Sequence, residues 1–494
     1  MTDDTQQSVL LTTFTSKKKR YKVFFHQGKI IWDNERPPSA QITVPIENVI
    51  AVEHNVLQPK HPLDDPTVDF NSFIIHYAER GPKKVWKYCS ILFCHTDQLQ
   101  VSSWVKTLQN HLQTFTHRPK NLLMFVNPFG GKRNAMRVYE KHAKPLFAIA
   151  GVDVTVTVSQ RKDQIKDLIS NHNLDMFDSV ACVGGDGTVS EVFNGLVIRE
   201  CRLKDVDIDD RSVELPRPSL PVGVIPGGST DTIAYCLHGT SDVTTAVLHI
   251  ILGDCLGLDL VSVYNENRFL RLYASVSSYG YLGDVIYHSD KHRWMGPKRY
   301  DYSGFRKIIA NRGYQGEISV LFERSELSQS KCYENCVLCI GKDDTETASA
   351  SDIKLEEELV WKTITGKYFM VSGANISCAC ARSPNGIAPY SHIGDGNLHV
   401  VLVHHTSLIN NIRLLLRLVK KSGTIEDLPF IEVHKGREFS FRSIDKASRW
   451  NCDGEVQVEP DIHAKVRCQL LKVFGKGNPS SVDESSTRCC GFCK

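Results

Sequence analysis

The chain has 494 residues, of which 41% are hydrophobic and 23% charged, and this is an ordinary composition for a globular protein of two or three domains. The net charge of +3 argues against a nucleic-acid-binding protein. No apolar run is long enough to cross a bilayer and MTDDTQQSVLLTTF lacks a signal-peptide pattern, so the sixteen cysteines predict reduced thiols in the cytosol.

Residues 1–116 are predicted to form a β-rich domain. Apolar and polar residues alternate as in antiparallel strands in VLLTTFT, YKVFFHQGKIIWD, AQITVPIENVIAVEH and FNSFIIHYAER. An amphipathic helix follows in DQLQVSSWVKTLQNHLQTF, with Leu99, Trp104, Leu108 and Leu112 as its apolar residues. Strands closed by one helix with a central tryptophan resemble a pleckstrin homology domain, a small β-barrel.

Residues 117–265 alternate between strand and helix patterns, which predicts an α/β nucleotide-binding domain with a parallel sheet. Strands dominate residues 266–475, and we expect a β-sandwich domain there. Residues 476–494 form a polar, cysteine-rich tail.

The stretch CVGGDGTVSEVFNGL, residues 182–196, is predicted to form the end of a strand, a glycine turn and a helix. Three glycines around Asp186 permit unusual backbone angles and the close approach of a ligand: Gly184, Gly185 and Gly187. Thr188 and Glu191 match a capping box, which predicts a helix start near Thr188. A glycine turn with a capping aspartate is the plainer interpretation of this stretch.

Two further glycine turns follow predicted strands, in NPFGGK (127–132) and PGGST (226–230). Because the carboxyl ends of parallel strands share one edge of a sheet, all three turns are expected to meet there. Backbone amides at a helix N-terminus favour phosphate, and Lys132 and Arg133 add positive charge to the first turn.

The motifs NPFGGK, GGDGTVSEVFNGL, PGGSTD and WNCDGEV, in this order, resemble the diacylglycerol kinase catalytic family, which includes sphingosine and ceramide kinases. The resemblance implies an enzyme that binds ATP with Mg²⁺ between an α/β and a β-sandwich domain and phosphorylates a lipid hydroxyl. It implies that Asp186 is the catalytic base, and that Gly184, Gly185 and Gly187 border the substrate with it.

The same resemblance assigns residues to ATP and to the lipid. The implied ATP contacts are Asn127, Pro128, Phe129, Ser159, Gln160, Arg161, Lys162, Asp163, Glu191, Gly228, Ser229, Thr230, Arg293, Arg299, Asp453, Gly454 and Glu455. Asp284 is implied at the lipid head group. A plain run of surface charges is the alternative interpretation of 280–304, and the match at 159–163 is weak.

Within the family, the chain is most similar to the ceramide kinases. The supporting features are the N-terminal domain, Asp231 in PGGSTD, SCACARSPNGIAPYSHIGDG, RYDYSG and KCYENCVLC. The expected reaction is transfer of the γ-phosphoryl group of ATP to the primary hydroxyl of ceramide. Sphingosine or diacylglycerol kinase activity, or a non-catalytic lipid-binding role, are the alternatives. Arg133 departs from the family, which usually has glycine there.

Two basic segments indicate partners. SKKKR, 16–20, lies where pleckstrin homology domains bind anionic phosphoinositides, although a solvated turn explains it equally well. LINNIRLLLRLVKK, 408–421, is a basic amphipathic helix that either packs on the second domain or binds Ca²⁺–calmodulin or an anionic membrane. We expect a cytoplasmic protein, peripheral on Golgi or plasma membranes.

The cysteines leave two interpretations open. Cys332, Cys336 and Cys339, with Cys378 and Cys380 elsewhere, suit a zinc site, but the spacing does not identify a fourth ligand. Free or redox-sensitive thiols are the alternative, and no metal ligand is assigned. The terminal CCGFCK is a candidate for S-acylation.

Overall fold

The computed structural model describes residues 9–34, 41–56, 71–82, 85–131, 133–266, 268–296, 298–322, 330–340, 359–420 and 423–478. Residues 479–494 of the cysteine-rich tail, including CCGFCK, all of 341–358, and Lys132 therefore lie outside the described residues.

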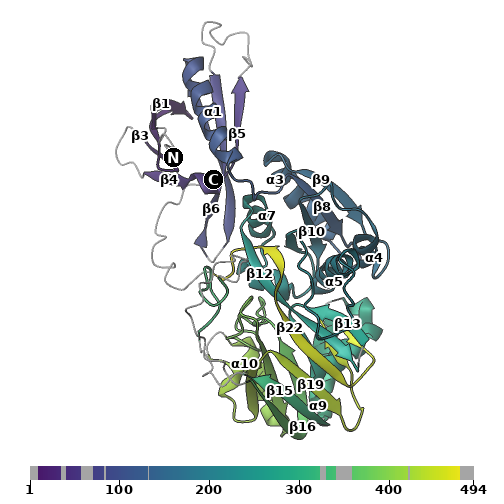
Figure 1. Cartoon of the computed structure of the whole chain (residues 1–494). Helices are drawn as coiled ribbons and strands as arrows, with labels where there is room; N and C mark the ends of the chain where they lie inside the picture. Colours follow the sequence, from purple (N-terminus) through teal and green to yellow (C-terminus); the bar gives the residue numbers. More distant parts are fainter. Residues whose placement is uncertain are drawn as a thin grey trace, which may run out of the picture.

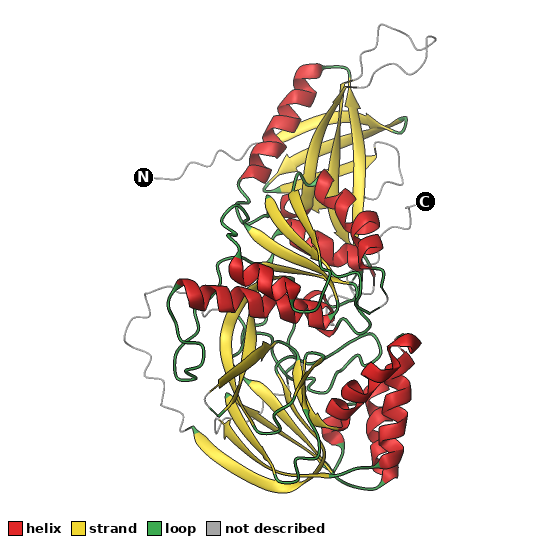
Figure 2. Ribbon diagram, turned by 90° about the vertical axis from the view of Figure 1, so that its right-hand side faces the viewer, coloured by secondary structure: helices red, strands yellow, loops and turns green. Residues whose placement is uncertain are grey.

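The N-terminal domain is a seven-stranded antiparallel sheet with the order β4-β3-β2-β1-β7-β6-β5 (Figure 1). Its elements are β1 (Leu10–Ser16), β2 (Lys19–His26), β3 (Lys29–Asn34), β4 (Ile42–Pro45), η1 (Ile46–Asn48), β5 (Val49–Val56), β6 (Asn71–Arg80), β7 (Trp86–His95) and α1 (Gln98–Gln113). α1 runs along the sheet (Figure 2) and buries Trp104, whose Nε1 donates to Thr12 Oγ1 at 2.9 Å. The pleckstrin-homology-like architecture is confirmed.

Two details of this domain differ from the sequence-based expectations. β7 is a strand that the alternation of apolar and polar residues did not predict. Leu99 lies exposed in the first turn of α1, whereas Val101, Val105 and Leu108 face the core. The buried stripe of α1 therefore starts at Val101 and not at Leu99.

The N-terminal domain packs directly on the α/β domain. Trp86 of β7 is buried against α7 (Val243–Leu252), where its backbone N–H donates to Thr245 Oγ1 at 2.9 Å. Its ring meets the His249 ring edge-on at 5.5 Å. Arg118, in the connecting segment, donates to the carbonyl oxygens of Glu47 and Val49 at 2.6 and 2.7 Å. Buried side chains, and not the linker alone, join the two domains.

Four parallel strands form the centre of the α/β domain, in the order β11-β10-β8-β9. They are β8 (Asn121–Val126), β9 (Asp153–Val158), β10 (Ser179–Gly184) and β11 (Val222–Pro226). One face is covered by α2 (Ala135–Val138), η3 (Tyr139–Ala143), α3 (Lys144–Ile149) and α7. The other is covered by α4 (Gln164–Asn171), α5 (Asp186–Leu203) and α6 (Thr232–His238). The predicted α/β domain with a parallel sheet is confirmed, and helices cover both faces of the sheet.

The strand-rich region continues this sheet, and together they make a mixed sheet of fifteen strands among the described residues. Its strands are β12 (Cys255–Asn265), β13 (Arg268–Tyr273), β14 (Val276–Gly280), β15 (Tyr314–Phe322), β16 (Val360–Ala374), β17 (Leu398–His404), β18 (Ile431–Gly436), β19 (Glu438–Ser443), β20 (Trp450–Cys452), β21 (Glu455–Gln457) and β22 (Ile462–Phe474). Its helices are α8 (Tyr281–Ser289), η4 (Asp290–Met295), α9 (Lys298–Ala310), α10 (Leu408–Val419) and η5 (Ile425–Asp427).

β22 connects the two halves of the sheet. It pairs parallel with β11 where Val222 meets Val473, and antiparallel with both β12 and β19. Figure 1 shows β22, in yellow, running from the lower, strand-rich region up to the α/β domain. The last strand thus joins the strand-rich region to the first residue of β11 in the α/β domain.

Candidate active site

The three glycine turns meet at one edge of the sheet, as predicted. The Gly227 N–H donates to the Gly184 carbonyl at 2.9 Å. A Cβ at Gly228 would lie 2.5 Å from Cα of Gly185, and one at Gly131 would lie 2.7 Å from Cα of Gly228. Real Cβ atoms do not tolerate such distances, so glycine is required where the three turns touch.

Asn127 ties the first turn to the second. Its Nδ2 donates to Thr188 Oγ1 at 3.0 Å, and its Oδ1 accepts the Phe129 N–H at 3.0 Å. Its own N–H donates to the Val183 carbonyl at 3.1 Å. These bonds leave Phe129 65% exposed at the rim, next to Pro128. Asn127 therefore fixes the shape of the turn, whatever the turn binds.

Asp186 is the first residue of α5, and its carboxylate turns toward the N-terminus of α6. It accepts the N–H groups of Ile233 and Thr232 at 3.0 and 3.2 Å, and the Thr230 hydroxyl at 3.4 Å. Burial raises its pKa to about 6, the two amides oppose the rise, and the charges of Asp231 and Asp453 add to it. A carboxyl group with a pKa near neutrality, held by fixed donors, suits proton transfer.

The predicted capping box is wrong. α5 begins at Asp186, two residues before Thr188, and no side chain caps its N-terminus. Glu191 instead accepts the N–H of Ile165 at 3.1 Å, in the first turn of α4. Burial raises the pKa of Glu191, and the amides of that turn oppose the rise. The Glu191 carboxylate therefore interacts with the N-terminus of the neighbouring helix α4, whereas its spacing from Thr188 predicted an interaction with the N-terminus of its own helix, α5.

The loop after β9 meets the segment after β20. Lys162 forms an ion pair with Glu455, and this contact raises the pKa of Lys162. Ser159 is buried, while Gln160 and Arg161 donate backbone N–H groups to Gln164 at the start of α4. Lys162 and Glu455 therefore connect the α/β domain with the strand-rich domain across the site.

The Asp453 carboxylate is engaged in hydrogen bonds with the protein backbone. It is buried, and it accepts the N–H groups of Ala274, Ser275 and Val276 at 2.6, 2.9 and 3.1 Å. Gly454 follows with a φ of +88°. A Cβ at Gly187 would lie 3.9 Å from Oε1 of Glu455. The DGE segment thus reaches the GGDG turn through Glu455, with Asp453 as its anchor.

Asp284 lies on α8 in the strand-rich domain and is buried. Its carboxylate accepts hydrogen bonds from Ser448 Oγ at 2.6 Å, Tyr314 OH at 2.8 Å and Lys307 Nζ at 3.0 Å. Asp284 was predicted from the sequence, but none of these three partners was. They come from β15, α9 and the segment before β20, and no local spacing links them.

The arginines that were predicted near the phosphates lie on different elements of the structure. Arg299 stands on α9, where its guanidinium contacts the neighbouring Tyr300. Arg293 lies on η4, and its side chain is outside the described residues. Arg133 adopts a φ of +56°, a left-handed conformation that costs a non-glycine residue about 1 kcal/mol. This conformation explains why glycine suits that position.

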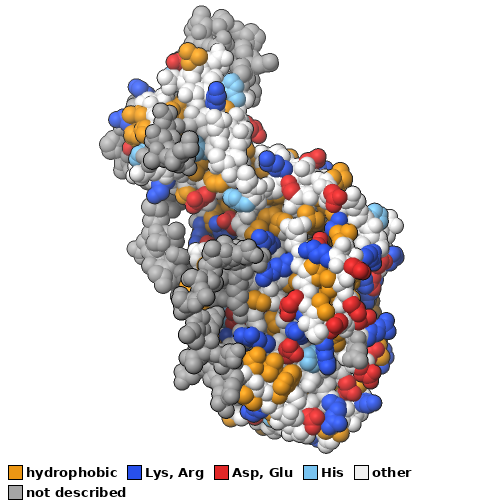
Figure 3. Space-filling model, in the orientation of Figure 1, with side chains coloured by type: hydrophobic (Ala, Val, Ile, Leu, Met, Phe, Trp, Pro, Cys, Tyr) orange, Lys and Arg blue, Asp and Glu red, His pale blue; other side chains and the backbone are white. Residues whose placement is uncertain are grey.

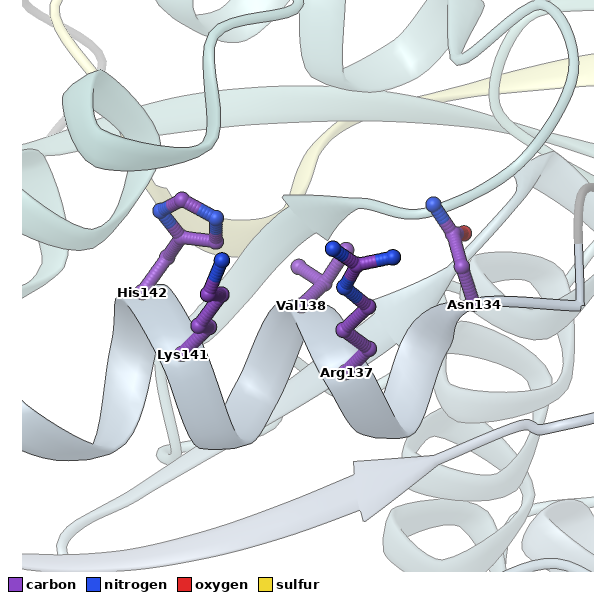
Figure 4. A pocket seen from close by; sticks show the side chains of 5 residues that line it. All are labelled: Asn134, Arg137, Val138, Lys141 and His142. Atoms are coloured by element: carbon purple, nitrogen blue, oxygen red, sulfur yellow. The ribbon is translucent and has the colours of Figure 1, made fainter.

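Beyond the first turn, α2 and η3 carry a basic hollow of about 240 Å³ (Figure 4). Asn134, Arg137, Lys141 and His142 extend from one side of this helix. Because the hollow begins at the helix that leaves the first glycine turn, its cations add positive potential beside that turn.

Comparisons with known proteins agree with this geometry. Residues 121–263 match the diacylglycerol kinase catalytic domain, residues 275–448 the ceramide kinase C-terminal domain, and residues 10–108 the ceramide kinase PH domain. A glycine-turn site with an aspartate at its centre, on this fold, defines an ATP-dependent lipid kinase. Human ceramide kinase is 33% identical, with 89% of this chain and 90% of that protein covered. The ceramide kinase of Arabidopsis thaliana is 29% identical, at 83% and 82% coverage. The chain belongs to the ceramide kinase family.

A crystal structure of a putative diacylglycerol kinase from Bacillus anthracis str. Sterne matches with a TM-score of 0.49 at 14% identity, covering 72% of this chain and 96% of that one. No helix in the described part of the chain combines the length and hydropathy needed to cross a bilayer.

Proposed function

We propose that the protein transfers the γ-phosphoryl group of ATP to the primary hydroxyl of ceramide, giving ceramide 1-phosphate. The observation that carries this proposal is the Asp186 carboxylate, held where three glycine turns meet and with its pKa raised to about 6. The matches to both ceramide-kinase-specific domains support ceramide as the acceptor.

Asp186 is the proposed general base. Phosphoryl transfer depends mainly on positioning and charge neutralisation, and on a group that receives the proton of the attacking hydroxyl. The amides of Ile233 and Thr232 fix the direction of the carboxylate, and its ionised form dominates above pH 6. The lipid oxygen then bonds to the γ-phosphorus while ADP leaves.

The glycine turns are the proposed phosphate site. Asn127, Pro128, Phe129, Gly228, Ser229 and Thr230 would line it. Ser229 is half-buried and Thr230 exposed at the edge of the third turn, so both residues are accessible to a nucleotide. The Lys162–Glu455 pair joins the two domains beside this site, which supports a nucleotide position between them.

The residues also fit Mg²⁺. Asp186 and Glu455 border the same turn, and the charges of Asp231 and Asp453 raise the pKa of Asp186, so the site concentrates negative charge that a cation would neutralise. Mg²⁺ prefers one or two carboxylates together with phosphate oxygens and water. When bound, it would neutralise charge on the transferring phosphate. Glu455 is the proposed side-chain ligand, because the carboxylates of Asp186 and Asp453 both accept backbone amides and Asp186 is the proposed base.

Asp284 is proposed to bind the polar head of the lipid. The hydrogen bonds from Tyr314, Lys307 and Ser448 hold its carboxylate in one orientation inside the strand-rich domain. A carboxylate accepts hydrogen bonds from hydroxyl and amide groups, both of which ceramide carries.

Apolar side chains exposed on neighbouring helices support a peripheral position on membranes. On α10, Ile409, Ile412 and Leu416 are 66%, 44% and 58% exposed, and Figure 3 shows hydrophobic side chains gathered over this helix. On α9, Phe305 and Ile309 are also exposed. Such surfaces bury favourably at a lipid interface, where an insoluble substrate resides.

Membrane targeting is also proposed for the N-terminal domain. Lys17 and Lys18 form the turn between β1 and β2, Lys19 and Arg20 begin β2, and all four are exposed. A cluster of cations at a turn attracts anionic lipids, and phosphoinositides of Golgi or plasma membranes are the proposed ligands. Ca²⁺–calmodulin is a second proposed partner, at 408–421, where Leu414 is buried in the domain while the opposite face of α10 is open.

Phosphate transfer from labelled ATP by the purified full-length protein tests the catalytic proposal. Ceramide, sphingosine and diacylglycerol are offered in mixed micelles with Mg²⁺, beside Asp186→Asn. Product on ceramide alone, lost in the variant, is expected. Product on another lipid would replace ceramide as the acceptor, and a folded protein with no product would favour a non-catalytic lipid-binding role.

A further inference from the structure

Four side chains that can bind a metal ion lie close together in space, and all four are far from Asp186 in the sequence. Cys332, Cys336, Cys339 and His392 place one ligand atom each within 4.8 Å of the others. Cys332 Sγ lies 3.7 Å from Cys339 Sγ, and Cys336 Sγ lies 3.2 Å from His392 Nδ1. Ligand atoms around a tetrahedral Zn²⁺ with Zn–S bonds of about 2.3 Å lie about 3.8 Å apart. These two distances, with all four atoms within 4.8 Å of one another, fit a closed tetrahedral site.

The surrounding structure orients these ligands. His392 Nε2 lies 3.2 Å from the Ser330 carbonyl oxygen, to which it can only donate, so Nδ1 presents its lone pair to the thiols. Gln469 of β22 donates through Nε2 to the Cys339 carbonyl at 2.9 Å and to the Gly394 carbonyl at 2.8 Å. The Cys339 N–H donates to the Cys336 carbonyl at 3.0 Å, which closes the turn between these two cysteines. Each ligand segment is fixed by bonds of its own.

The other candidate cysteines do not join this group. Cys378 Sγ contacts the carbonyl oxygens of Ile376 and Ser275 at 3.2 and 3.5 Å, and Cys380 lies in a short bridge with Ser383. In the ranges that the structure describes, the Cys332–His392 group is the one set of three or more such side chains that could share an ion.

We propose that Cys332, Cys336, Cys339 and His392 bind one structural Zn²⁺. Three thiolates and one imidazole leave no coordination position for water or substrate, so the ion is structural and not catalytic. Binding converts three thiols to thiolates and releases three protons, while His392 binds as the neutral imidazole. The proposal is independent of the lipid that the enzyme phosphorylates.

The location of the cluster indicates what the ion would stabilise. Within the 330–340 segment, Glu334 pairs with Arg80 of the N-terminal domain at 3.3 Å, and its N–H donates to the Asn478 carbonyl at 2.6 Å. Cys332 also lines a cavity of about 260 Å³ together with Tyr235 and Cys236 of α6. That helix begins with the amides that hold Asp186. The ion would thus fix a segment that contacts both the N-terminal domain and the helix beside the catalytic base.

Metal analysis of the full-length protein, with any affinity tag removed and no chelator used, tests the proposal. Elemental analysis is expected to find one zinc per chain. Replacement by Co²⁺ is expected to give the intense absorption of tetrahedral thiolate ligation, a readout that does not depend on activity. Cys336→Ser and His392→Ala should lose the metal, whereas Cys255→Ser, which changes an exposed free thiol, should keep it.

Three results would overturn the inference. The first is a folded wild-type protein without stoichiometric zinc whose Co²⁺ form lacks the thiolate absorption. The second is an intact mass that shows a Cys332–Cys339 disulfide in place of free thiols. The third is an unchanged zinc content and Co²⁺ spectrum in His392→Ala. Two of these results are measured on the wild type, so the proposal can be refuted even if a variant fails to fold.

Discussion

Asp186→Asn separates the chemical role of this residue from its structural role. Asparagine has the same shape, and its Oδ1 can still accept the Ile233 N–H that the carboxylate accepts at 3.0 Å. It cannot receive a proton from a lipid hydroxyl. Loss of a general base lowers kcat by about 10²–10⁴. KM for ATP should change less than about threefold, because the glycine turns do not depend on this charge.

The pH dependence of the wild type provides an independent check. Burial raises the pKa of Asp186 from 3.8 to about 6, with contributions from Asp231 and Asp453. Because the base acts only when ionised, kcat should fall about tenfold per pH unit below 6 and level off above it. An ordinary carboxyl group would put the same decline near pH 4.

The same shift predicts the stability of the variant. The folded pKa lies above the unfolded value, so ionisation destabilises the folded state; this cost is absent below pH 3.8 and complete above about pH 6. The full shift corresponds to about 3 kcal/mol, and partial solvent exposure reduces it to about 1–2 kcal/mol. Asp186→Asn should therefore be at least as stable as the wild type at pH 8, measured by denaturant unfolding.

The assay is initial-rate phosphate transfer to ceramide in mixed micelles from pH 5 to 9. Asp175→Asn, which removes an exposed carboxylate of the same domain, serves as the matched control and should leave kcat unchanged. A folded Asp186→Asn enzyme with kcat within threefold of the wild type would refute the assignment of the base. A wild-type acid limb near pH 4 would refute the link between burial and the pKa.

Three other predictions concern the contacts around the site. Glu455→Gln removes the ion pair with Lys162; for this partly exposed pair we expect a loss below about 1 kcal/mol in unfolding free energy but a severalfold higher KM for ATP, and an unchanged KM would contradict the proposed ATP role. Asp284→Asn leaves Lys307 without its buried partner and should cost about 3 kcal/mol, measured by denaturant unfolding, with a raised KM for ceramide; a stable variant with normal KM would count against the proposal. Trp86→Ala removes a buried ring between two domains and should cost about 3–5 kcal/mol; limited proteolysis that does not cut faster between residues 113 and 121 would show that other contacts suffice.

The local parts of the site were predictable from the sequence. The apolar strands before NPF, GGDG and PGGST predicted parallel neighbours, and the structure pairs β8, β10 and β11 in that way. The contact between residues 185 and 228 that requires glycine there is tertiary, but the glycine turns themselves are visible in the sequence. The patterns that predict a strand, a glycine turn and a helix each extend over about ten residues, so they can be recognised from the sequence alone.

The error at Glu191 shows the limit of such reasoning. The spacing of Thr188 and Glu191 is that of a capping box, but Glu191 instead accepts the Ile165 N–H of α4. Two helix N-termini compete for one carboxylate, and the outcome depends on how α4 packs on α5. Spacing along one helix contains no information about its neighbour.

By itself the sequence determined the order of the domains, the three glycine turns and the aspartate at their centre, because each depends on residues close together in the chain. Only the tertiary structure decided the distant partners: Glu455 beside Lys162, Lys307 beside Asp284, and His392 as the fourth member of a cysteine cluster that begins 60 residues earlier, at Cys332. The physical reason is that β22, at the end of the chain, joins the two halves of the mixed sheet. Which side chains then meet across it is set by strand register and helix packing, and not by separation along the sequence.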